Sequence, residues 1–351
     1  MEKVFLQACR GEQPAHTPIW LNRQAGRYMP EYHQVKGDLP SLDFFKNPEK
    51  AAQATLDAQR ILGVDAAIMF ADLLPILEPM GLHLDYLPGE GPVFSNPIRH
   101  EQDVAALQTA PAIEATPYIA DTVRCINADL PKHIALIGFA GAPFTLASYA
   151  IEGRGSRNYV EVKKMMHNRP DLWAQLMDKL VQQLVSYLQL QISAGVEAVQ
   201  LFDTWVGNLS IQDYTTFVHP YLEKMLQQLG TTVPVIYFGT GNSHLLPSVS
   251  TLPFDVLAFD WRTPLIATWE QLGCKAVQGN LDPIILCAEQ RAIGQQAGQL
   301  LHDVAGRGGH IFNLGHGIIP ETPVDNVKFL VDFVHQHSAR SSVSTHHPGE
   351  L

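Results

Sequence analysis

The sequence has few charged residues and little positive charge. Only 17% of its 351 residues are charged, and 35 acidic against 24 basic side chains give a net charge of −11. A nucleic-acid-binding surface is rich in lysine and arginine, so DNA- and RNA-binding functions are excluded. An anionic ligand would have to be attracted by a local group of basic residues, because the field of the whole molecule opposes it.

Cysteines and long hydrophobic runs are also scarce. The four cysteines form no Cys-x-x-Cys pair, and no His-x-Cys precedes a distant cysteine, which argues against a disulfide framework and a thiolate zinc site. We therefore expect reduced thiols and no metal. No stretch of about 18 apolar residues is available to span a membrane, and the first residues lack the apolar core of a signal peptide. These features predict a cytoplasmic protein without a membrane partner.

Eight short apolar segments alternate with helical patterns along the chain. Such alternation is typical of a parallel sheet covered by helices, and eight repeats favour a single closed (β/α)8 barrel over a doubly wound sheet. We expect one domain over residues 1–337 and a disordered, Ser/His/Pro-rich tail over 338–351. The predicted strands are 17–21, 65–70, 134–139, 198–202, 233–238, 256–259, 275–278 and 310–313. The main predicted helices are 47–62, 112–129, 170–194, 211–229 and 324–337.

Two irregular segments interrupt this pattern. Residues 75–97 are rich in proline and glycine and are consistent with a long loop or a hairpin. Residues 152–157 are polar, basic and glycine-containing, which is consistent with a mobile flap.

The loop after the first predicted strand carries two arginines that flank Gly26. Arg23 and Arg27 are four residues apart, and a guanidinium matches carboxylate or phosphate groups. Glycine lets the backbone turn tightly and approach a ligand. The loop is therefore predicted to bind an anion; the alternative is a loop with two solvated arginines.

Polar side chains follow most of the predicted strands. In a barrel these positions share one mouth, where the active site lies. The candidates are Arg23, Arg27, Asp72, Asp203, Thr204, Asp260, Asn280 and His316, with Tyr149 one turn into the helix after the third strand.

Each candidate also has a purely structural interpretation. Asp72 could cap the helix that follows its strand, and Asp203 and Asp260 could likewise be caps or orienting groups. Thr204 could be a loop hydroxyl, and Tyr149 a core residue. His316 lies between two glycines, and we expect its imidazole to be exposed in the mouth and able to carry a proton near neutral pH.

Two long motifs resemble the uroporphyrinogen decarboxylase family. They are Arg-Gln-Ala-Gly-Arg-Tyr-Met-Pro-Glu-Tyr, within residues 22–32, and Gly-Phe-Ala-Gly-Ala-Pro-Phe-Thr-Leu, at 138–146. Segments 70–72, 201–205 and 313–317 are also similar to family segments, so the resemblance runs from about Phe5 to His337. It implies a single distorted (β/α)8 barrel that acts as a homodimer and needs neither a metal nor an organic cofactor.

The resemblance also implies a reaction and a set of site residues. The reaction converts the four acetate side chains of uroporphyrinogen III to methyl groups, giving coproporphyrinogen III and four CO2. Asp72 would bind the pyrrole N–H groups and stabilise the protonated ring, while Arg23 and Arg27 would bind substrate carboxylates. The positions that match substrate-binding residues are Arg23, Gln24, Ala25, Gly26, Arg27, Asp72, Tyr149, Thr204 and His316. Gly153-Arg154-Gly155 departs from a glycine triplet common in relatives, so flap contacts are not carried over.

Two other functions fit the sequence less well. A cobalamin-linked methyltransferase of the same superfamily would bind zinc through His and Cys, but the His-x-Cys pattern is absent. A non-catalytic porphyrinogen carrier would use the same arginines, but it would not need a carboxylate at the ring centre.

Overall fold

A curled sheet of parallel strands lies at the centre of the molecule. The computed structural model describes residues 2–87, 89–230 and 232–340, and in these ranges seven strands pair in the order β1-β4-β5-β6-β7-β8-β9. Their bounds are β1 Ala66–Ile68, β4 Ala135–Gly141, β5 Ala198–Asp203, β6 Val235–Gly239, β7 Val256–Ala258, β8 Ala276–Gln278 and β9 His310–Ile311. Seven of the eight predicted strands are thus confirmed.

The first predicted strand, 17–21, differs from the prediction. It is present only as an isolated bridge between Ile19 and Phe312. On its other side the N–H of Asp65 donates to the carbonyl of Ile19 at 2.9 Å, but the N–H of Ile19 donates to the Asp65 carboxylate at 2.8 Å. Because a side-chain oxygen takes the place of a backbone carbonyl, the regular ladder that defines a strand is interrupted here.

The excursion at 75–97 is a hairpin. Strands β2 (Leu84–Leu87) and β3 (Gly91–Phe94) pair antiparallel, with Tyr86 opposite Pro92. A short 3-10 helix, η1 (Pro75–Leu77), precedes them. The hairpin alternative for this segment is therefore confirmed.

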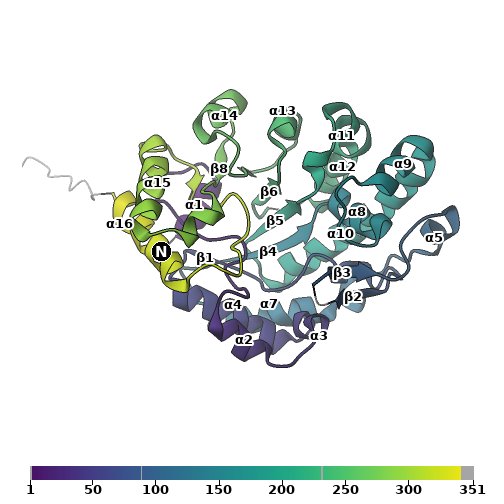
Figure 1. Cartoon of the computed structure of the whole chain (residues 1–351), viewed down its shortest axis with the longest axis horizontal. Coiled ribbons are helices and arrows are strands. Elements are labelled where there is room, and N and C mark those ends of the chain that lie inside the picture. Colours follow the sequence, from purple (N-terminus) through teal and green to yellow (C-terminus); the bar gives the residue numbers. More distant parts are fainter. Residues whose placement is uncertain (1, 88, 231, 341–351) are drawn as a thin grey trace, which may run out of the picture.

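Helices surround the sheet (Figure 1). The α-helices are α1 Val4–Cys9, α2 Pro30–Lys36, α3 Ser41–Phe45, α4 Pro48–Leu62, α5 Glu101–Ala106, α6 Ala112–Ala115, α7 Pro117–Asp129, α8 Pro143–Glu152, α9 Val160–Asn168, α10 Pro170–Ala194, α11 Ile211–Phe217, α12 His219–Leu229, α13 Leu246–Val249, α14 Leu265–Leu272, α15 Gln290–Asp303 and α16 Val324–Ser338. The remaining 3-10 helices are η2 Val206–Asn208, η3 Ser243–Leu245 and η4 Pro283–Cys287.

Two predicted helices are each divided by a proline. The helix predicted over 112–129 is α6 and α7, with Pro117 at the start of α7, and the one predicted over 211–229 is α11 and α12, which begins His219-Pro220. Proline disfavours helical backbone in the residue before it, and Thr116, before Pro117, is accordingly not helical. The second break falls at Val218, directly before His219. The predicted helices α4, α10 and α16 are confirmed within a residue.

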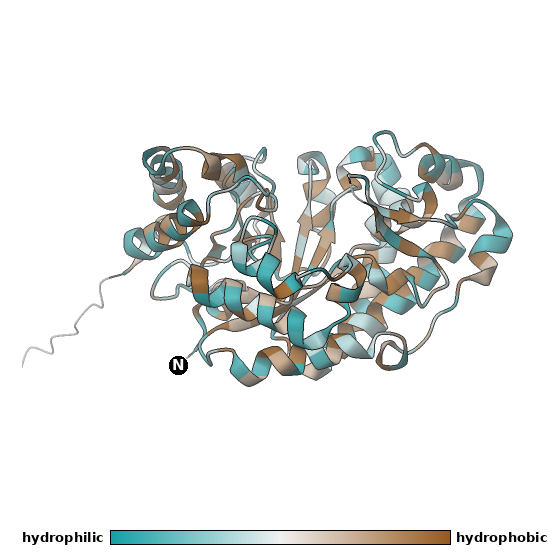
Figure 2. Cartoon of the chain, turned by 60° about the horizontal axis from the view of Figure 1, so that its bottom comes forward, coloured by the Kyte–Doolittle hydropathy of each residue, from teal (hydrophilic) through white to brown (hydrophobic). Residues whose placement is uncertain are grey.

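The core lies between the strands and the inner faces of the helices. Figure 2 shows hydrophobic residues concentrated on the central strands and hydrophilic residues on the outer surfaces of the helices. Five leucines that repeat every four residues along α10 are all buried: Leu172, Leu176, Leu180, Leu184 and Leu188. No described helix combines the length and the hydrophobicity that crossing a membrane requires.

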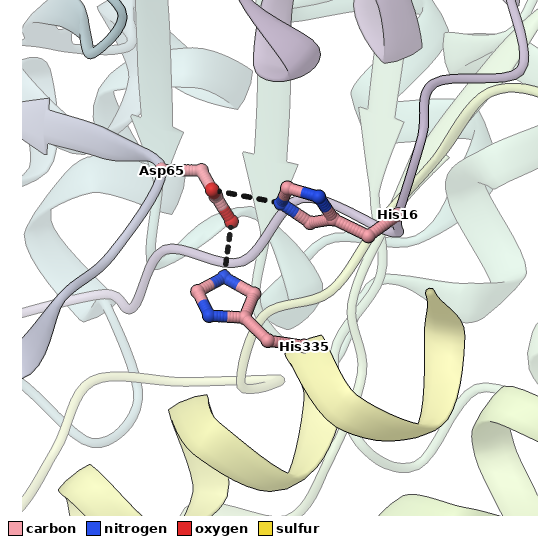
Figure 3. A group of neighbouring side chains, drawn as sticks. All are labelled: His16, Asp65 and His335. Atoms are coloured by element: carbon pink, nitrogen blue, oxygen red, sulfur yellow. Dashed lines mark hydrogen bonds and ion pairs between the residues drawn. The ribbon is translucent and has the colours of Figure 1, made fainter. Parts of the chain in front are cut away.

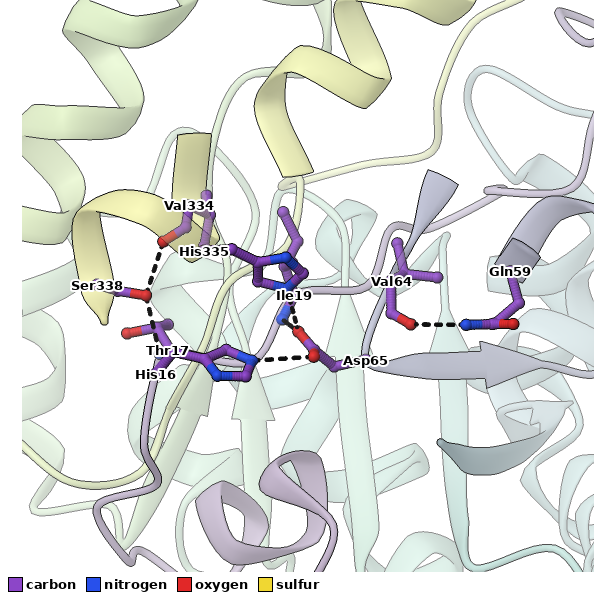
Figure 4. A network of polar contacts seen from close by, with 9 residues as sticks. All are labelled: His16, Thr17, Ile19, Gln59, Val64, Asp65, Val334, His335 and Ser338. Atoms are coloured by element: carbon purple, nitrogen blue, oxygen red, sulfur yellow. Dashed lines mark hydrogen bonds and ion pairs between the residues drawn. The ribbon is translucent and has the colours of Figure 1, made fainter. Parts of the chain in front are cut away.

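The last helix, α16, is tied to the amino-terminal end of β1 by Asp65. His16 Nε2 and His335 Nε2 lie 3.0 and 2.9 Å from the two oxygens of this carboxylate, and Figure 3 shows the carboxylate between the two rings. The N–H of Thr17 also donates to the hydroxyl of Ser338, in the final turn of α16 (Figure 4). Three segments far apart in sequence therefore meet at one end of the sheet. Of the tail predicted over 338–351, Ser338 is helical and residues 341–351 lie outside the described ranges.

Candidate active site

A cavity of about 570 Å³ opens at the carboxyl ends of the strands. Loops after β1, β5 and β6 contribute to its wall, together with residues 22–28 and the β2–β3 hairpin. Eight predicted site residues line it: Arg23, Ala25, Gly26, Arg27, Asp72, Tyr149, Thr204 and His316. Segments spread over most of the sequence thus converge in one hollow, as the barrel interpretation requires.

Gln24 is the exception among the predicted substrate-binding residues. It is 1% exposed and does not line the cavity. Its side-chain oxygen accepts from the N–H of Leu21 at 3.1 Å, and its amide N–H donates to the carbonyl of Ala66 at 3.1 Å. Gln24 therefore holds the arginine loop against β1, and its side chain does not face a ligand.

Three further candidates lie beneath the mouth instead of in it. Asp203, Asp260 and Asn280 are buried and do not line the cavity. The Asp203 carboxylate accepts from the hydroxyls of Thr145 and Tyr237, each at 2.8 Å. The prediction that these three share the mouth is wrong, because hydrogen bonds within the protein turn them inward.

The two arginines are exposed at the cavity, and no described residue forms a hydrogen bond or ion pair with either guanidinium. Arg23 has φ 63°, a left-handed backbone conformation that is uncommon for a residue with a side chain. The loop turns back on itself, since the Tyr28 hydroxyl donates to the carbonyl of Gln24 at 2.7 Å. The structure therefore presents two cations whose donors remain available to a ligand.

A chain of buried amides inside the sheet supports this loop. The Trp20 indole N–H donates to Gln278 at 2.9 Å, and the Gln278 amide donates to Gln200 at 3.0 Å. The Gln200 amide donates to the side-chain oxygen of Asn22 at 3.2 Å. Buried polar groups are costly unless they are hydrogen-bonded, so this chain specifies the position of Asn22, the residue that precedes Arg23.

Asp72 is partly buried in the cavity wall. One carboxylate oxygen accepts from the N–H of Leu74 at 3.0 Å, which closes a tight turn before η1. The 3-10 helix itself has no side-chain cap, so the interpretation of Asp72 as a helix cap is wrong. Burial raises the pKa of Asp72, while Tyr86, the Leu74 N–H and the charge of Arg23 oppose that rise. The carboxylate thus serves the turn and also faces the cavity.

His316 lies between aromatic rings. Its imidazole centroid is 6.5 Å from that of Phe238 and 6.0 Å from that of Trp261. Burial and the nearby charge of Arg23 lower the pKa of His316. These surroundings favour the neutral ring over the protonated one.

Tyr149 lies beside Trp205 in the cavity wall, with ring centroids 5.7 Å apart. Burial and the negative charge of Asp72 raise the pKa of its hydroxyl to about 12. Tyr149 is therefore a neutral hydrogen-bonding group at neutral pH. Thr204 lines the cavity beside Trp205, so the predicted loop hydroxyl is available there.

Sequence reasoning missed the aromatic part of the wall. The additional aromatic lining residues are Tyr28, Tyr32, Phe45, Phe70, Tyr86, Phe139, Phe202, Trp205 and Phe238. Phe202 meets Phe139 and Phe238 edge-on, at 5.7 and 6.0 Å. In the sequence these side chains cannot be distinguished from core residues, because aromatic residues are also common in a hydrophobic core.

The predicted flap, 152–157, does not line the cavity. Arg154 lies 3.2 Å from Glu90 in the β2–β3 hairpin, and the carbonyl of Gly153 accepts from the N–H of Phe94 at 2.7 Å. The segment is thus joined to the hairpin at its amino-terminal end.

Within residues 2–87, 89–230 and 232–340, one group has the composition of a metal site. It is His16, Asp65 and His335, whose potential ligand atoms all lie within 4.8 Å of one another. The group is at the opposite end of β1 from the cavity, and the Asp65 carboxylate already accepts hydrogen bonds from Ile19 and the two imidazoles. This group is therefore separate from the cavity.

Comparison with known proteins places the chain in a family. The model of the uroporphyrinogen decarboxylase (URO-D) family matches residues 2–337. Uroporphyrinogen decarboxylase from Roseiflexus sp. (strain RS-1) is 48% identical over 342 residues, 95% of this chain and 98% of the relative. The enzyme of the same name from Koribacter versatilis (strain Ellin345) is 47% identical over 340 residues, 96% of this chain and 97% of the relative.

Solved structures support the fold. A methyltransferase from Methanosarcina mazei superposes with a TM-score of 0.80 at 18% identity, covering 96% of this chain and 99% of that one. At this level of identity the likeness concerns the fold alone. Matched along nearly its whole length and almost half identical to named members, the chain belongs to the uroporphyrinogen decarboxylase family.

Proposed function

We propose that the chain decarboxylates the four acetate side chains of uroporphyrinogen III to methyl groups, giving coproporphyrinogen III and four CO2 in tetrapyrrole biosynthesis. The observation that carries the proposal is the meeting of Asp72, Arg23 and Arg27 in one cavity of a chain of this family. A cavity of about 570 Å³ is within the range of small-molecule sites. No metal or organic cofactor takes part in the proposed reaction.

Asp72 is the proposed partner of the macrocycle. A porphyrinogen points four pyrrole N–H donors toward its centre, and a carboxylate can accept several of them. Protonation of a pyrrole carbon makes the ring cationic. The C–C bond to the acetate carboxylate then breaks, CO2 leaves, and the bonding electron pair moves into the ring. The methylene carbon takes up a proton and the ring carbon releases one, so each decarboxylation consumes one proton in total.

The negative charge of Asp72 lowers the barrier of this step. An anion about 4 Å from the developing cation would contribute ~4 kcal/mol at an effective dielectric constant near 20. Because the cation exists only after protonation, the interaction is stronger in the transition state than in the bound substrate.

Arg23 and Arg27 are the proposed binding groups for acetate and propionate carboxylates. Their guanidinium groups face the cavity without partners among the described residues, and charge-assisted bonds to carboxylates are the strong ones. Ala25 and Gly26 bring the loop backbone to the same wall. Gln24 is proposed to act indirectly, by holding the loop in place.

Tyr149, Thr204 and His316 are proposed to orient side-chain carboxylates at the rim. A neutral imidazole and two hydroxyls can each donate one hydrogen bond without adding charge. The aromatic residues between them form apolar walls for the macrocycle.

The proposal also covers the closure of the barrel, the oligomeric state and the cellular compartment. Segment 17–21 hydrogen-bonds to both edges of the curled sheet, next to β1 and next to β9. It would act as an eighth strand and close a single (β/α)8 domain over residues 1–337. The chain would act as a homodimer in the cytoplasm. Light scattering of the purified protein tests the dimer.

The decisive experiment is an anaerobic incubation with uroporphyrinogen III and no added cofactor. We expect four CO2 per substrate and coproporphyrinogen III as the product. Asp72→Asn should bind substrate but turn it over at least a hundredfold more slowly, because the neutral amide does not stabilise the ring cation. Binding without CO2 release by the parent chain would indicate a carrier, and parental turnover by Asp72→Asn would refute the role of Asp72.

A further inference from the structure

Tyr86 is a cavity residue to which neither the motifs nor the proposed reaction assigns a role. It lies in β2, and its cross-strand neighbour Pro92 and the adjacent Gly91 also line the cavity. Its ring packs edge-on against Phe45 with centroids 5.4 Å apart. The hairpin and α3 thus hold the ring at the cavity wall, which fixes where its hydroxyl can reach.

The Tyr86 hydroxyl is shielded from solvent and has no hydrogen-bond partner of good geometry among the described residues. A buried donor without an acceptor is destabilising, so such a group points to a missing interaction. Asp72 lines the same cavity and uses one oxygen for the Leu74 N–H. A carboxylate has about four acceptor positions on its two oxygens, so Asp72 can accept a further donor.

Several titratable groups act on Asp72, and they come from different elements. They are Arg23 in the loop after residue 22, Tyr32 in α2, Tyr86 in β2, Tyr149 in α8 and Tyr187 in α10. The charge of Arg23 lowers the pKa of Asp72. Asp72 affects the pKa values of Tyr32, Tyr149 and Tyr187 only through its negative charge. Tyr86 alone among these tyrosines also lowers the pKa of Asp72 as a hydrogen-bond donor, and its hydroxyl is buried in the same cavity with no other acceptor among the described residues. Burial and the charge of Asp72 raise the pKa of the Tyr86 hydroxyl, so it remains a donor throughout the neutral range.

We propose that Tyr86 is a positioning residue for Asp72, whose hydroxyl donates to the carboxylate and keeps it ionised and turned into the cavity before substrate binds. The inference rests on the proposed function only for its consequence in catalysis. The carboxylate must be charged to stabilise a cationic ring, yet the cavity wall penalises that charge. A neutral donor offsets the cost of burying this charge and does not attract substrate carboxylates. A second cation beside Asp72 would attract them.

The test is a titration of Asp72 in the ligand-free protein by NMR of ¹³C-labelled aspartate carboxyls. The Asp72 signal is identified by its loss in Asp72→Asn. We expect Tyr86→Phe to raise the pKa of Asp72 by about one unit, a tenfold change in its ionisation constant. Tyr86→Met, which also lacks the hydroxyl, should raise it in the same direction and serves if the phenylalanine variant does not fold.

A matched control is Tyr214→Phe, which removes another buried hydroxyl that has no partner among the described residues. The carboxylate that affects the pKa of Tyr214 is Asp203, not Asp72. It should leave the Asp72 titration unchanged. The acid limb of the pH profile of kcat/KM should shift to higher pH in Tyr86→Phe and remain unchanged in Tyr214→Phe. An unchanged or lowered Asp72 pKa in a folded Tyr86 variant would overturn the proposal.

The titration uses no substrate, so its result is independent of the reaction. A parent chain that releases no CO2 would contradict the proposed function while the Tyr86 variants could still shift Asp72.

Discussion

The side chain of Arg23 occupies the space that Gly317 leaves free. A Cβ atom at residue 317 would lie 2.4 Å from Cδ and 2.8 Å from Cγ of Arg23, well inside contact distance. The two loops are also joined by a hydrogen bond, in which the N–H of Ile318 donates to the carbonyl of Asn22 at 3.0 Å. The loop after β9 therefore determines where one of the two cavity arginines points.

Gly317→Ala should displace the Arg23 stem while leaving the barrel folded. Because a displacement of about 1 Å can cost about a hundredfold in rate, we expect kcat/KM for uroporphyrinogen III to fall ten- to a hundredfold, mostly through KM. Steady-state kinetics and thermal unfolding measure the two effects. Gly298→Ala is the matched control, since its nearest neighbour atoms are ordinary contacts at 3.5 and 3.7 Å; a parental KM in Gly317→Ala would contradict the prediction.

Arg27→Ala should weaken substrate binding. A substrate carboxylate left without its charged partner loses about 1–3 kcal/mol, which corresponds to a rise in KM of roughly five- to a hundred-and-fiftyfold. Arg291→Ala, in the exposed surface of α15 away from the cavity, should behave as the parent. If Arg27→Ala also keeps the parental KM, the arginine is solvated and takes no part in binding.

Asp203→Ala should destabilise the fold. Its carboxylate accepts from Thr145 and Tyr237, and Thr145 in turn accepts from the N–H of Trp205 at 3.3 Å. Removal leaves two buried hydroxyls without an acceptor, so the free energy of unfolding should fall by about 2–5 kcal/mol. Urea denaturation measures the loss, with the exposed Asp38→Ala as a control. A loss below about 0.5 kcal/mol would show that Asp203 is not a structural anchor.

The Asp65 cluster should make stability depend on pH. Burial alone would raise the pKa of Asp65, but hydrogen bonds from His16 and His335 outweigh it and lower the pKa to about 2, from an ordinary 3.8. That stabilisation, about 2 kcal/mol, is present above pH ~4 and is lost as the pH falls toward 2. The hydrogen bond to Asp65 raises the pKa of His335 above its ordinary 6.5, so this contribution is present below 6.5 and is lost as the pH rises through the raised value.

The free energy of unfolding of Asp65→Asn should therefore differ most from the parent between about pH 4 and 6.5. Denaturation at pH 3, 5.5 and 9 measures the difference, with Asp38→Asn as the exposed control. A difference that does not vary with pH would show that the cluster acts through packing alone.

Much of the site could be predicted because polar residues follow the strands in sequence. Arg23, Arg27, Asp72, Tyr149, Thr204 and His316 all line the cavity, as expected from parallel strands that end at one edge. Asp203 could not be separated from them. It also follows a strand, and only the positions of Thr145 and Tyr237, far away in sequence, show that its carboxylate turns inward.

The order of the sheet strands, the place of the loop with two arginines and the family could be read from the sequence itself, because periodicity, turn residues and motifs are properties of neighbouring residues. The tertiary structure alone decided how Ile19 pairs, how Gly317 makes room for Arg23 and how the Asp203 carboxylate turns inward. These depend on contacts between segments that are distant along the chain, and burial and electrostatics act through space, where sequence separation has no direct meaning.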